Sequence, residues 1–505
     1  MAASAATAEV VLKANDGSID VAGELVEFKD GIYVIQTAIG PLSMSASRVR
    51  CEGAECPVIK VDKADIRISG SETVGEELMP LILAGYASRF DAEADVTTGS
   101  EGFEKAVSLI SEGGFGDEMV SFAIVSTGSE SGLADLQSGQ SEIAMSSRSV
   151  RPSEVKEFEA AGFGRLSDLA QERIVAVDSI RVIVSRENPV ESISTDDLAA
   201  IYAGEITNWA QIGGPNAPIN VYTRSEDTGT FDVIRTKLLR PRRKTLTPNA
   251  TVVSGNIEMS KAVSADRAAI GFVGYAFERG AKSVALRTAC GIEVKPEAFS
   301  AKTEEYPLQR RLYLYAGQND LSEHAAGLFD YVATEDVDGL VAKAGFVDLG
   351  IKQRPHEETA RRLRTDIDSS DDPYEQGVMR ELFVDLQDWD RLSTTFRFAS
   401  GSSVLDNKAQ RDLSRIANFL KFRPGAKIAV VGFTDSEGAF GANLDLASRR
   451  AAQVAAEIRA AAGDSLDAAN VEVKGYGELS PAACNSSFEG RKINRRVEIW
   501  LSKAS

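Results

Sequence analysis

Short alternations of apolar and polar residues mark the first part of the chain, over residues 9–57. The segments VVLKA, SIDVAGELVEF, GIYVIQT and LSMSASRVRC alternate with a period of two, which is typical of half-buried strands. They are separated by Asn15-Asp16-Gly17, Lys29-Asp30-Gly31 and Gly40-Pro41, and such short polar and glycine-containing sequences favour hairpin turns. The pattern predicts a small antiparallel β domain.

The pattern changes after Lys60, where short apolar runs are followed by helical stretches. DIRISGS leads into GEELMPLILAGYASRF, and similar pairs continue as far as FVDLGI, which ends at Ile351. Strands that alternate with helices indicate an α/β fold. Residues 58–351 are therefore predicted to form one α/β domain, long enough for two lobes around a cleft.

The last third of the chain begins with a segment rich in charge. Residues 352–388 are predicted to be a linker that becomes a helix, and we expect it to be extended enough to act as a tether. From residue 389 to residue 505 the order is strand, helix, strand, helix, strand, ending in RRVEIWLS. This order predicts a separate α+β domain, so the chain as a whole is multidomain α/β.

Composition and charge limit the kinds of molecule that this protein could bind. Hydrophobic residues make up 43% and charged residues 26% of the 505 residues, a balance typical of folded domains. The formal charge of −19 argues against a nucleic-acid partner, because phosphate backbones are bound chiefly by Lys and Arg. An anion would have to be bound locally, by oriented N–H groups and hydroxyls in a pocket poor in water.

The sequence predicts no transmembrane segment, since no stretch reaches the roughly 18–20 apolar residues that span a bilayer. The start, MAASAATAEV, lacks the basic and apolar regions of a signal peptide. We interpret it as a mature chain from which the signal has been removed; a cytosolic protein is the alternative.

Cysteine and histidine usage limits the chemistry. Cys51 and Cys56 are expected to form a small disulfide loop, with two free thiols as the alternative. Cys290 and Cys484 lie in different predicted domains, and spacing alone does not pair them. With only two histidines, His324 and His356, we expect no metal site, no cofactor and no catalytic residue.

Three junctions between a predicted strand and a predicted helix carry Gly with Ser or Thr: SGSET at Ser69, TGSESG at Thr127 and TGT at Thr228. Free backbone N–H groups and hydroxyls at such junctions can hold an oxyanion. Each hydroxyl can instead cap its own helix. Arg224, four residues before Thr228, adds a planar fork suited to two oxygens of one anion.

The middle segment resembles the periplasmic phosphate-binding proteins of ABC importers. The resemblance lies in RSEDTGT at Arg224–Thr230, LAAIYAGEITNWAQI at Leu198–Ile212, and GSESGLADLQSGQSEIAMSSR. It implies a two-lobed, type II-like periplasmic binding fold that binds phosphate in the cleft between its lobes and serves a permease. It also implies an anion-binding set of Ser71, Thr73, Ser129, Ser147, Arg224, Thr228, Gly229 and Thr230.

One position departs from that family. Many members carry Asp where this chain has Ser147, and the carboxylate accepts a hydrogen bond from protonated phosphate, which sulfate cannot donate. With Ser147 followed by Arg148, discrimination would have to come from another acceptor, with Glu72, Glu130, Glu226 and Asp227 as candidates. Each of these is alternatively a solvated surface carboxylate, and sulfate or another oxyanion is an alternative ligand.

The C-terminal part resembles the OmpA-like peptidoglycan-binding domain along its whole length. The motifs are FASGSSVL, GFTDSEG, NLDLASRRAAQV, GYGELSP and NSSFEGRKINRRVEI. Diaminopimelate in the peptide stem has a zwitterionic end, which needs a carboxylate for its ammonium and an Arg fork for its carboxylate. Asp435 and Arg450 can supply that pair. The resemblance adds Asn443 to orient the peptide and Arg496 to line or brace the same region, with Arg491 and Arg495 structural or peripheral. The alternative is an ordinary surface ion pair.

These observations together predict a periplasmic oxyanion-binding protein held to the cell wall. The expected partners are phosphate, the peptidoglycan stem and an ABC permease. The alternative is a wall-anchored scaffold whose binding domain has lost or changed its ligand.

Overall fold

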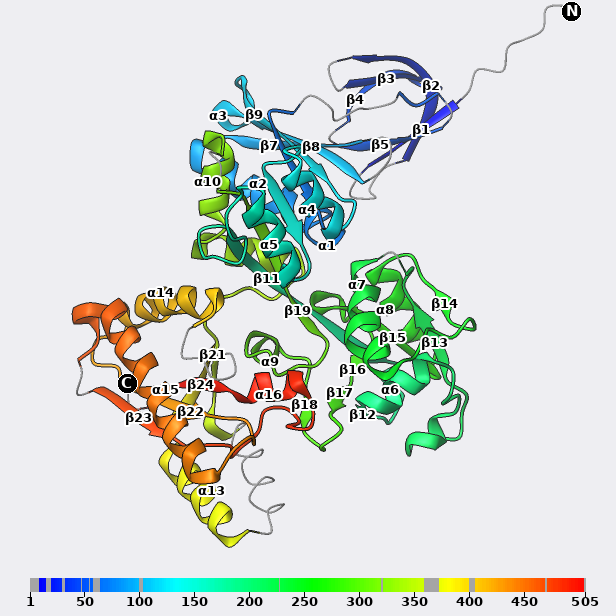
Figure 1. The fold of residues 1–505 in the computed structure, drawn as a ribbon. Coiled ribbons are helices and arrows are strands. Elements are labelled where there is room, and N and C mark those ends of the chain that lie inside the picture. Colours follow the sequence, from blue (N-terminus) through cyan, green and yellow to red (C-terminus); the bar gives the residue numbers. More distant parts are fainter. Residues whose placement is uncertain are drawn as a thin grey trace, which may run out of the picture. The chain divides into compact units, whose positions relative to one another are not determined.

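The computed structural model describes residues 9–14, 20–29, 32–46, 48–53, 55–57, 64–99, 103–226, 228–318, 321–357, 372–398, 405–467 and 470–503. They belong to two compact units, one of Met1–Val175 with Arg311–Ala344 and one of Ala176–Arg310 with Gly345–Ser505. The first lobe is residues 64–175 with 311–344, the second lobe is residues 176–310, and the C-terminal module is residues 345–503 (Figure 1).

The N-terminal residues form an antiparallel sheet of the order β4-β3-β2-β1-β5. The alternating residues of β1 and β3 place Val10, Leu12, Tyr33 and Ile35 in a small core. A disulfide joins Cys51 and Cys56, as the sequence predicts. The strands are β1 (Glu9–Ala14), β2 (Asp20–Lys29), β3 (Ile32–Thr37), β4 (Gly40–Ser45) and β5 (Val49–Glu52).

The first lobe is built on strands of the order β19-β10-β6-β9-β8-β7, of which β6, β9 and β10 run parallel. Parallel strands end at the same edge of a sheet, and the loops that follow them therefore meet there. The strands are β6 (Ile66–Gly70), β7 (Glu93–Thr98), β8 (Glu104–Ile110), β9 (Glu118–Val125), β10 (Ile143–Ser146) and β19 (Gln309–Ala316). The helices are α1 (Glu72–Gly75), α2 (Leu78–Ala87), α3 (Ser111–Gly114), α4 (Ser129–Gln137), α5 (Pro152–Ala160), α10 (Glu323–Tyr331) and α11 (Asp338–Lys343).

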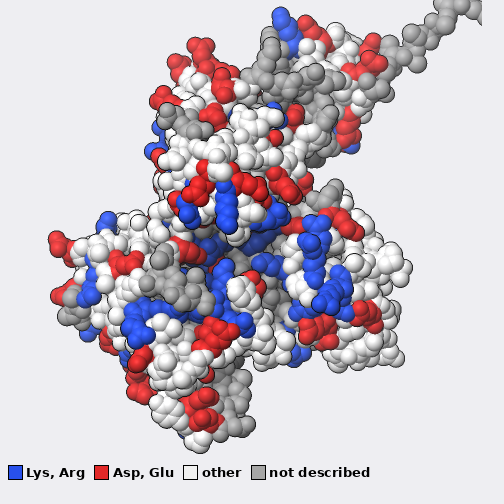
Figure 2. Space-filling view, in the orientation of Figure 1, with Lys and Arg blue, Asp and Glu red and all other residues white. Residues whose placement is uncertain are grey.

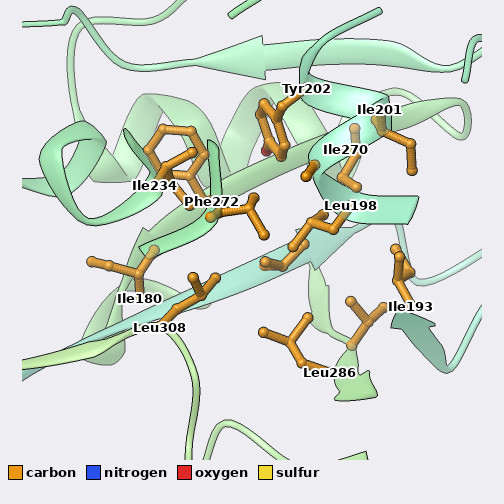
Figure 3. Close-up of a cluster of buried hydrophobic side chains, with 14 of the residues drawn as sticks. Ile180, Ile193, Leu198, Ile201, Tyr202, Ile234, Ile270, Phe272, Leu286 and Leu308 are labelled. Carbon is orange, nitrogen blue, oxygen red and sulfur yellow. The ribbon is translucent and has the colours of Figure 1, made fainter. Parts of the chain in front are cut away.

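The second lobe packs its helices around strands of the order β14-β13-β15-β11. Its core is filled by large apolar side chains, among them Tyr202, Phe272 and Leu308, which converge on the strands in Figure 3. The strands are β11 (Glu172–Val184), β12 (Ser192–Ser194), β13 (Asn220–Thr223), β14 (Thr251–Val252), β15 (Ala269–Gly274), β16 (Lys282–Ser283), β17 (Ala285–Arg287) and β18 (Glu293–Val294). The helices are α6 (Thr195–Tyr202), α7 (Gly229–Val233), α8 (Asn256–Ala265) and α9 (Ala298–Lys302).

The C-terminal module is a sheet of the order β20-β21-β24-β22-β23 with helices on both faces. In β22, Ala429, Val431 and Phe433 pack on the face of α13, while Ile428 and Val430 pack with α14 and α15. Because both faces are covered, this strand is apolar throughout. The elements are β20 (Gln353–Arg354), α13 (Pro373–Asp385), β21 (Trp389–Arg397), α14 (Asn407–Lys421), β22 (Ile428–Phe433), α15 (Phe440–Ala462), β23 (Val471–Gly475), α16 (Phe488–Asn494) and β24 (Arg496–Ser502).

The segment predicted to be a tether, residues 352–388, contains β20 and α13, and residues 358–371 within it lie outside the described residues. Within the described residues, no helix is both long and apolar enough to cross a bilayer. A second disulfide, which the sequence did not pair, joins Cys290 of the second lobe to Cys484 of the C-terminal module. This bond limits the freedom that a tether would give.

Candidate functional site

Three loops of the first lobe meet at the carboxyl ends of β6, β9 and β10. The Gly128 N–H donates to the Gly70 carbonyl at 2.8 Å, and the Ser71 N–H donates to the Met145 carbonyl at 3.0 Å. Gly70 and Gly128 have φ angles of 138° and 109°, which favour glycine. A Cβ on Gly70 would lie 2.1 Å from the Met145 carbonyl oxygen, so this close approach also requires glycine.

The predicted residues Ser71, Ser129 and Ser147 come together on these loops. The Ser147 N–H donates to Ser129 Oγ at 3.0 Å, and the two hydroxyl oxygens are 3.3 Å apart. Neither Ser71 nor Ser129 caps its own helix, because Ser71 makes no side-chain cap bond and Gly128 is the residue that precedes α4. Thr73 lies two residues after Ser71, half-buried in α1. The alternative that each hydroxyl only caps a helix therefore does not hold for this group.

Arg148, which follows Ser147, is directed to a carboxylate. Its guanidinium forms a fork with Glu154, with nitrogen to oxygen distances of 2.8 and 2.7 Å. Burial acts to raise the pKa of Glu154, but the hydrogen bonds from Arg148 and from the Arg151 N–H outweigh it and lower that pKa. Arg148 therefore fastens the loop after Ser147 to the start of α5.

The four candidate acceptors that could replace the missing carboxylate are placed differently. Glu130 and Glu226 are exposed, and Glu130 lies 3.8 Å from Arg151. Glu72 directly follows Ser71 at the start of α1 and is half-buried, whereas Glu130, which directly follows Ser129, is exposed. Asp227 lies outside the described residues.

In the second lobe, the Thr228 hydroxyl caps its own helix, which was the alternative to anion binding. Its hydroxyl donates to the Ser225 carbonyl at 2.8 Å and accepts from the Phe231 N–H at 3.3 Å, so it caps α7. Gly229 and Thr230 form the first turn of this helix, and Arg224 is half-buried at the end of β13. Figure 2 shows basic side chains gathered on the visible face of this lobe, in a chain whose formal charge is −19.

A buried arginine that sequence reasoning missed fixes the first turn of α7. Arg310 donates to the Gly229 carbonyl at 2.6 Å, to Asp232 at 2.9 Å and to Asp178 at 3.2 Å. Burial raises the pKa of Asp178, and the neighbouring Arg310 opposes that effect. The only sequence signal was a pair of arginines at the start of the apolar strand QRRLYLYA, far from the glycine-rich loop.

The four residues predicted to bind the cell wall lie in one region of the C-terminal module. Asp435 follows β22, and Asn443 and Arg450 lie on α15, where all three side chains are buried. Asn443 donates to the Asp435 carbonyl at 3.3 Å and to Glu478 at 2.5 Å. The Arg450 guanidinium lies 5.0 Å from the centre of the Phe398 ring.

Two adjacent arginines of this region have different carboxylate partners. Arg495, expected to be structural or peripheral, donates to Asp435 at 2.5 Å, whereas Arg496 turns away to Glu498 at 2.7 Å. Arg496 and Glu498 are two residues apart on β24, so their side chains share a face of the sheet. Arg496 therefore braces the region, which is one of the two roles expected of it.

The Arg450 guanidinium lies among other charged groups. Burial lowers the pKa of Arg450, the charge of Arg495 lowers it further, and Asp435 acts in the opposite direction. Arg450 and Arg495 thus both act near Asp435, and a guanidinium fork is suited to a carboxylate ligand.

Two known protein families match different parts of this chain. The profile described as PBP superfamily domain matches residues 62–336, which is more than half of the chain. The chain belongs to the PBP superfamily. The match confirms the predicted binding-protein fold, and the OmpA family matches residues 397–495, which confirms the C-terminal OmpA domain.

Individual relatives of the PBP domain and the OmpA domain cover different parts of the chain. The phosphate-binding protein PstS of Borreliella burgdorferi is 26% identical over 230 residues, 45% of this chain and 78% of that protein. The peptidoglycan-binding protein ArfA of Mycobacterium tuberculosis is 40% identical over 92 residues, 18% of this chain and 27% of that protein. The structure of an ABC-type phosphate transport receptor from Vibrio cholerae has 22% identity and a TM-score of 0.42, and covers 56% of this chain and 99% of that one.

Proposed function

We propose that the PBP domain binds phosphate or a similar oxyanion, and that the OmpA domain holds the chain to peptidoglycan through the diaminopimelate of the peptide stem. The protein would then act in the periplasm, associated with the wall, and would supply an ABC permease. The similarity to the phosphate-binding protein PstS supports phosphate as the ligand, and the similarity to the peptidoglycan-binding protein ArfA supports peptidoglycan.

The observation that carries the first part is the serine group of the first lobe. Ser71 and Ser129 are not used as caps of their own helices, and the Ser129 and Ser147 hydroxyls lie 3.3 Å apart at the ends of parallel strands. Hydroxyls and N–H groups of this kind bind an oxyanion in a chain whose net charge is negative. We propose that Arg224 and the N–H groups of Gly229 and Thr230 supply the remaining donors.

Calorimetric titration of phosphate and sulfate into the full chain tests this proposal. We expect phosphate to bind more tightly than sulfate, and Arg224→Ala to weaken phosphate binding by about 100-fold, because a guanidinium fork to an anion is lost. Arg267→Ala, at an exposed ion pair of the same lobe, is the matched control and should bind normally. The absence of binding heat for both anions would leave the scaffold alternative in place.

Sedimentation of the full chain with purified sacculi tests the second part. Asp435→Asn is expected to weaken binding by about 10-fold or more, because the ligand ammonium loses its charged partner. Asp445→Asn is the matched control, since Asp445 is exposed on α15 two residues beyond Asn443. Equal binding by both variants would contradict the assignment of Asp435.

A further inference from the structure

The second lobe of the PBP domain and the OmpA domain share covalent and buried contacts within one compact unit. The Cys290–Cys484 disulfide joins the loop before β18 to the loop before α16, and Figure 1 shows α16 beside β18 and α9. Separately, the loop after α9 contacts β21 through Arg397. Both contacts lead toward the residues around Asp435.

The first route runs through Arg397, which is buried at the end of β21. Its guanidinium donates to Glu304 at 3.0 Å and to the Thr303 carbonyl, both in the second lobe, and to the Ile493 carbonyl of α16. Phe398, the next residue, accepts at its carbonyl from Arg495 at 3.3 Å. Arg495 is the residue that binds the Asp435 carboxylate, so one short segment of β21 links Glu304 to the wall site.

The second route runs through the loop that carries Cys484. Asn494 accepts from the Ala483 N–H at 2.9 Å and donates to the Asn485 side chain at 2.8 Å. The same Asn485 oxygen accepts from the Ser436 N–H at 3.3 Å, and Ser436 follows Asp435 directly. The disulfide therefore fastens a loop that is hydrogen-bonded to the backbone beside Asp435.

The backbone of Glu304 is fixed by the end of α9. Glu304 has a φ angle of 60°, its N–H donates to the Ala301 carbonyl at 3.0 Å, and the Glu305 N–H donates to the Ser300 carbonyl at 2.9 Å. These are the hydrogen bonds of a helix that ends in a left-handed residue. The helix end therefore places the Glu304 carboxylate beside Arg397.

We propose that the second lobe of the PBP domain is part of the wall-binding site, with Glu304 and Cys290 as positioning residues that hold Arg495 and the loop beside Asp435 in the geometry that binds the peptidoglycan stem. The proposal rests on the wall binding proposed above. It means that the anion-binding domain contributes to wall affinity without contacting the wall.

Two changes in the full chain test the positioning role by sacculus binding. Glu304→Gln keeps the size of the side chain and removes its charge, and Glu304→Asp keeps the charge. We expect Glu304→Gln to weaken binding by about 3- to 10-fold, the effect of one net hydrogen bond, and Glu304→Asp to restore part of the loss. Glu293→Gln, an exposed carboxylate near Cys290 in the same lobe, is the control and should bind normally.

The disulfide is tested in a chain in which Cys51 and Cys56 are serine, so that only Cys290–Cys484 responds to dithiothreitol. The two thiols of the reagent convert the protein disulfide to two thiols and become a cyclic disulfide themselves. We expect reduction to weaken sacculus binding by a similar factor and reoxidation to restore it. If sacculus binding returns after reoxidation, the loss is due to the missing bond and not to irreversible damage to the fold.

The outcomes distinguish this proposal from the function on which it rests. If the unmodified chain does not bind sacculi, the wall function itself is overturned. If the unmodified chain binds and Asp435→Asn does not, while Glu304→Gln and the reduced chain bind as tightly as the unmodified one, the wall function stands and the positioning role is overturned. If Glu304→Gln and reduction of the disulfide both weaken sacculus binding, and reoxidation restores it, the positioning role is supported.

Discussion

Replacing Arg310 by methionine is expected to lower the free energy of unfolding of the second lobe by about 3–5 kcal/mol, because a buried carboxylate is left without its counter-charge. The exposed fraction is 7% for the Arg310 side chain and 5% for Asp178. The same change removes the donor to the Gly229 carbonyl, so the phosphate affinity proposed above should fall together with stability. Urea titration measures the change in the free energy of unfolding. Hydrogen exchange of peptides from β11 and α7 measures the change in these two elements.

The pH dependence of this variant has a defined sign. Burial already raises the pKa of Asp178 above its ordinary value, and the loss of Arg310 removes the charge that opposes that rise. A carboxyl whose pKa is raised in the folded state favours folding at low pH and loses that contribution as pH increases. The deficit of Arg310→Met should therefore shrink when the pH is lowered from about 7.5 to about 5.

Arg235 provides the matched control for Arg310. It pairs with the same Asp232, but its side chain is 45% exposed. Arg235→Met should therefore cost less than about 1 kcal/mol. A similar loss for both variants, or a deficit for Arg310→Met that grows at low pH, would contradict the explanation from a buried charge.

Replacing Arg391 by methionine is the second change for which we expect a large effect, again about 3–5 kcal/mol. Arg391 lies 2.6 Å from Glu305 and 3.0 Å from Glu498, and the exposed fractions of these three side chains are 1%, 5% and 1%. Burial acts to lower the pKa of Arg391, but the two carboxylates outweigh it and raise that pKa. Without Arg391, the Glu305 carboxylate loses this ion pair, whereas Glu498 still pairs with Arg496.

Tryptophan fluorescence includes a report on this transition, because Trp500, one of three tryptophans, donates its indole N–H to Glu498 at 3.2 Å. The matched control is Arg354→Met, since Arg354 pairs with Glu297 across the same two domains but Glu297 is 46% exposed. We expect this control to lose less than about 1 kcal/mol. If Arg391→Met unfolds at the same urea concentration as the unmodified chain, the two carboxylates are not stabilised by this arginine.

The parts of the fold that the sequence predicted are those determined by local pattern. Period-two alternation predicted the N-terminal sheet, and glycine beside serine predicted the junctions that bring Ser71 and Ser129 together. A glycine with positive φ is required where two backbones approach closely, so such residues leave a signal in a short segment. The local spacing of Cys51 and Cys56 predicted the first disulfide for the same reason.

The parts that the sequence could not predict depend on contacts between distant segments. Cys290 and Cys484 are 194 residues apart, and no spacing rule pairs them. The choice between Arg495 and Arg496 depends on where β24 begins, because neighbouring residues on a strand point to opposite faces. Arg310 reaches α7 from a strand 81 residues later in the chain, and nothing around it in the sequence marks that role.

The connectivity of the two disulfides has a consequence for how the chain matures. The first two cysteines of the chain, Cys51 and Cys56, are bonded to each other, and so are the last two, Cys290 and Cys484. Four cysteines allow three pairings, and only this one arises when oxidation follows the order in which the thiols leave the ribosome or the translocation pore. A simple thiol oxidase can therefore complete the molecule, with no enzyme needed to reshuffle mispaired bonds.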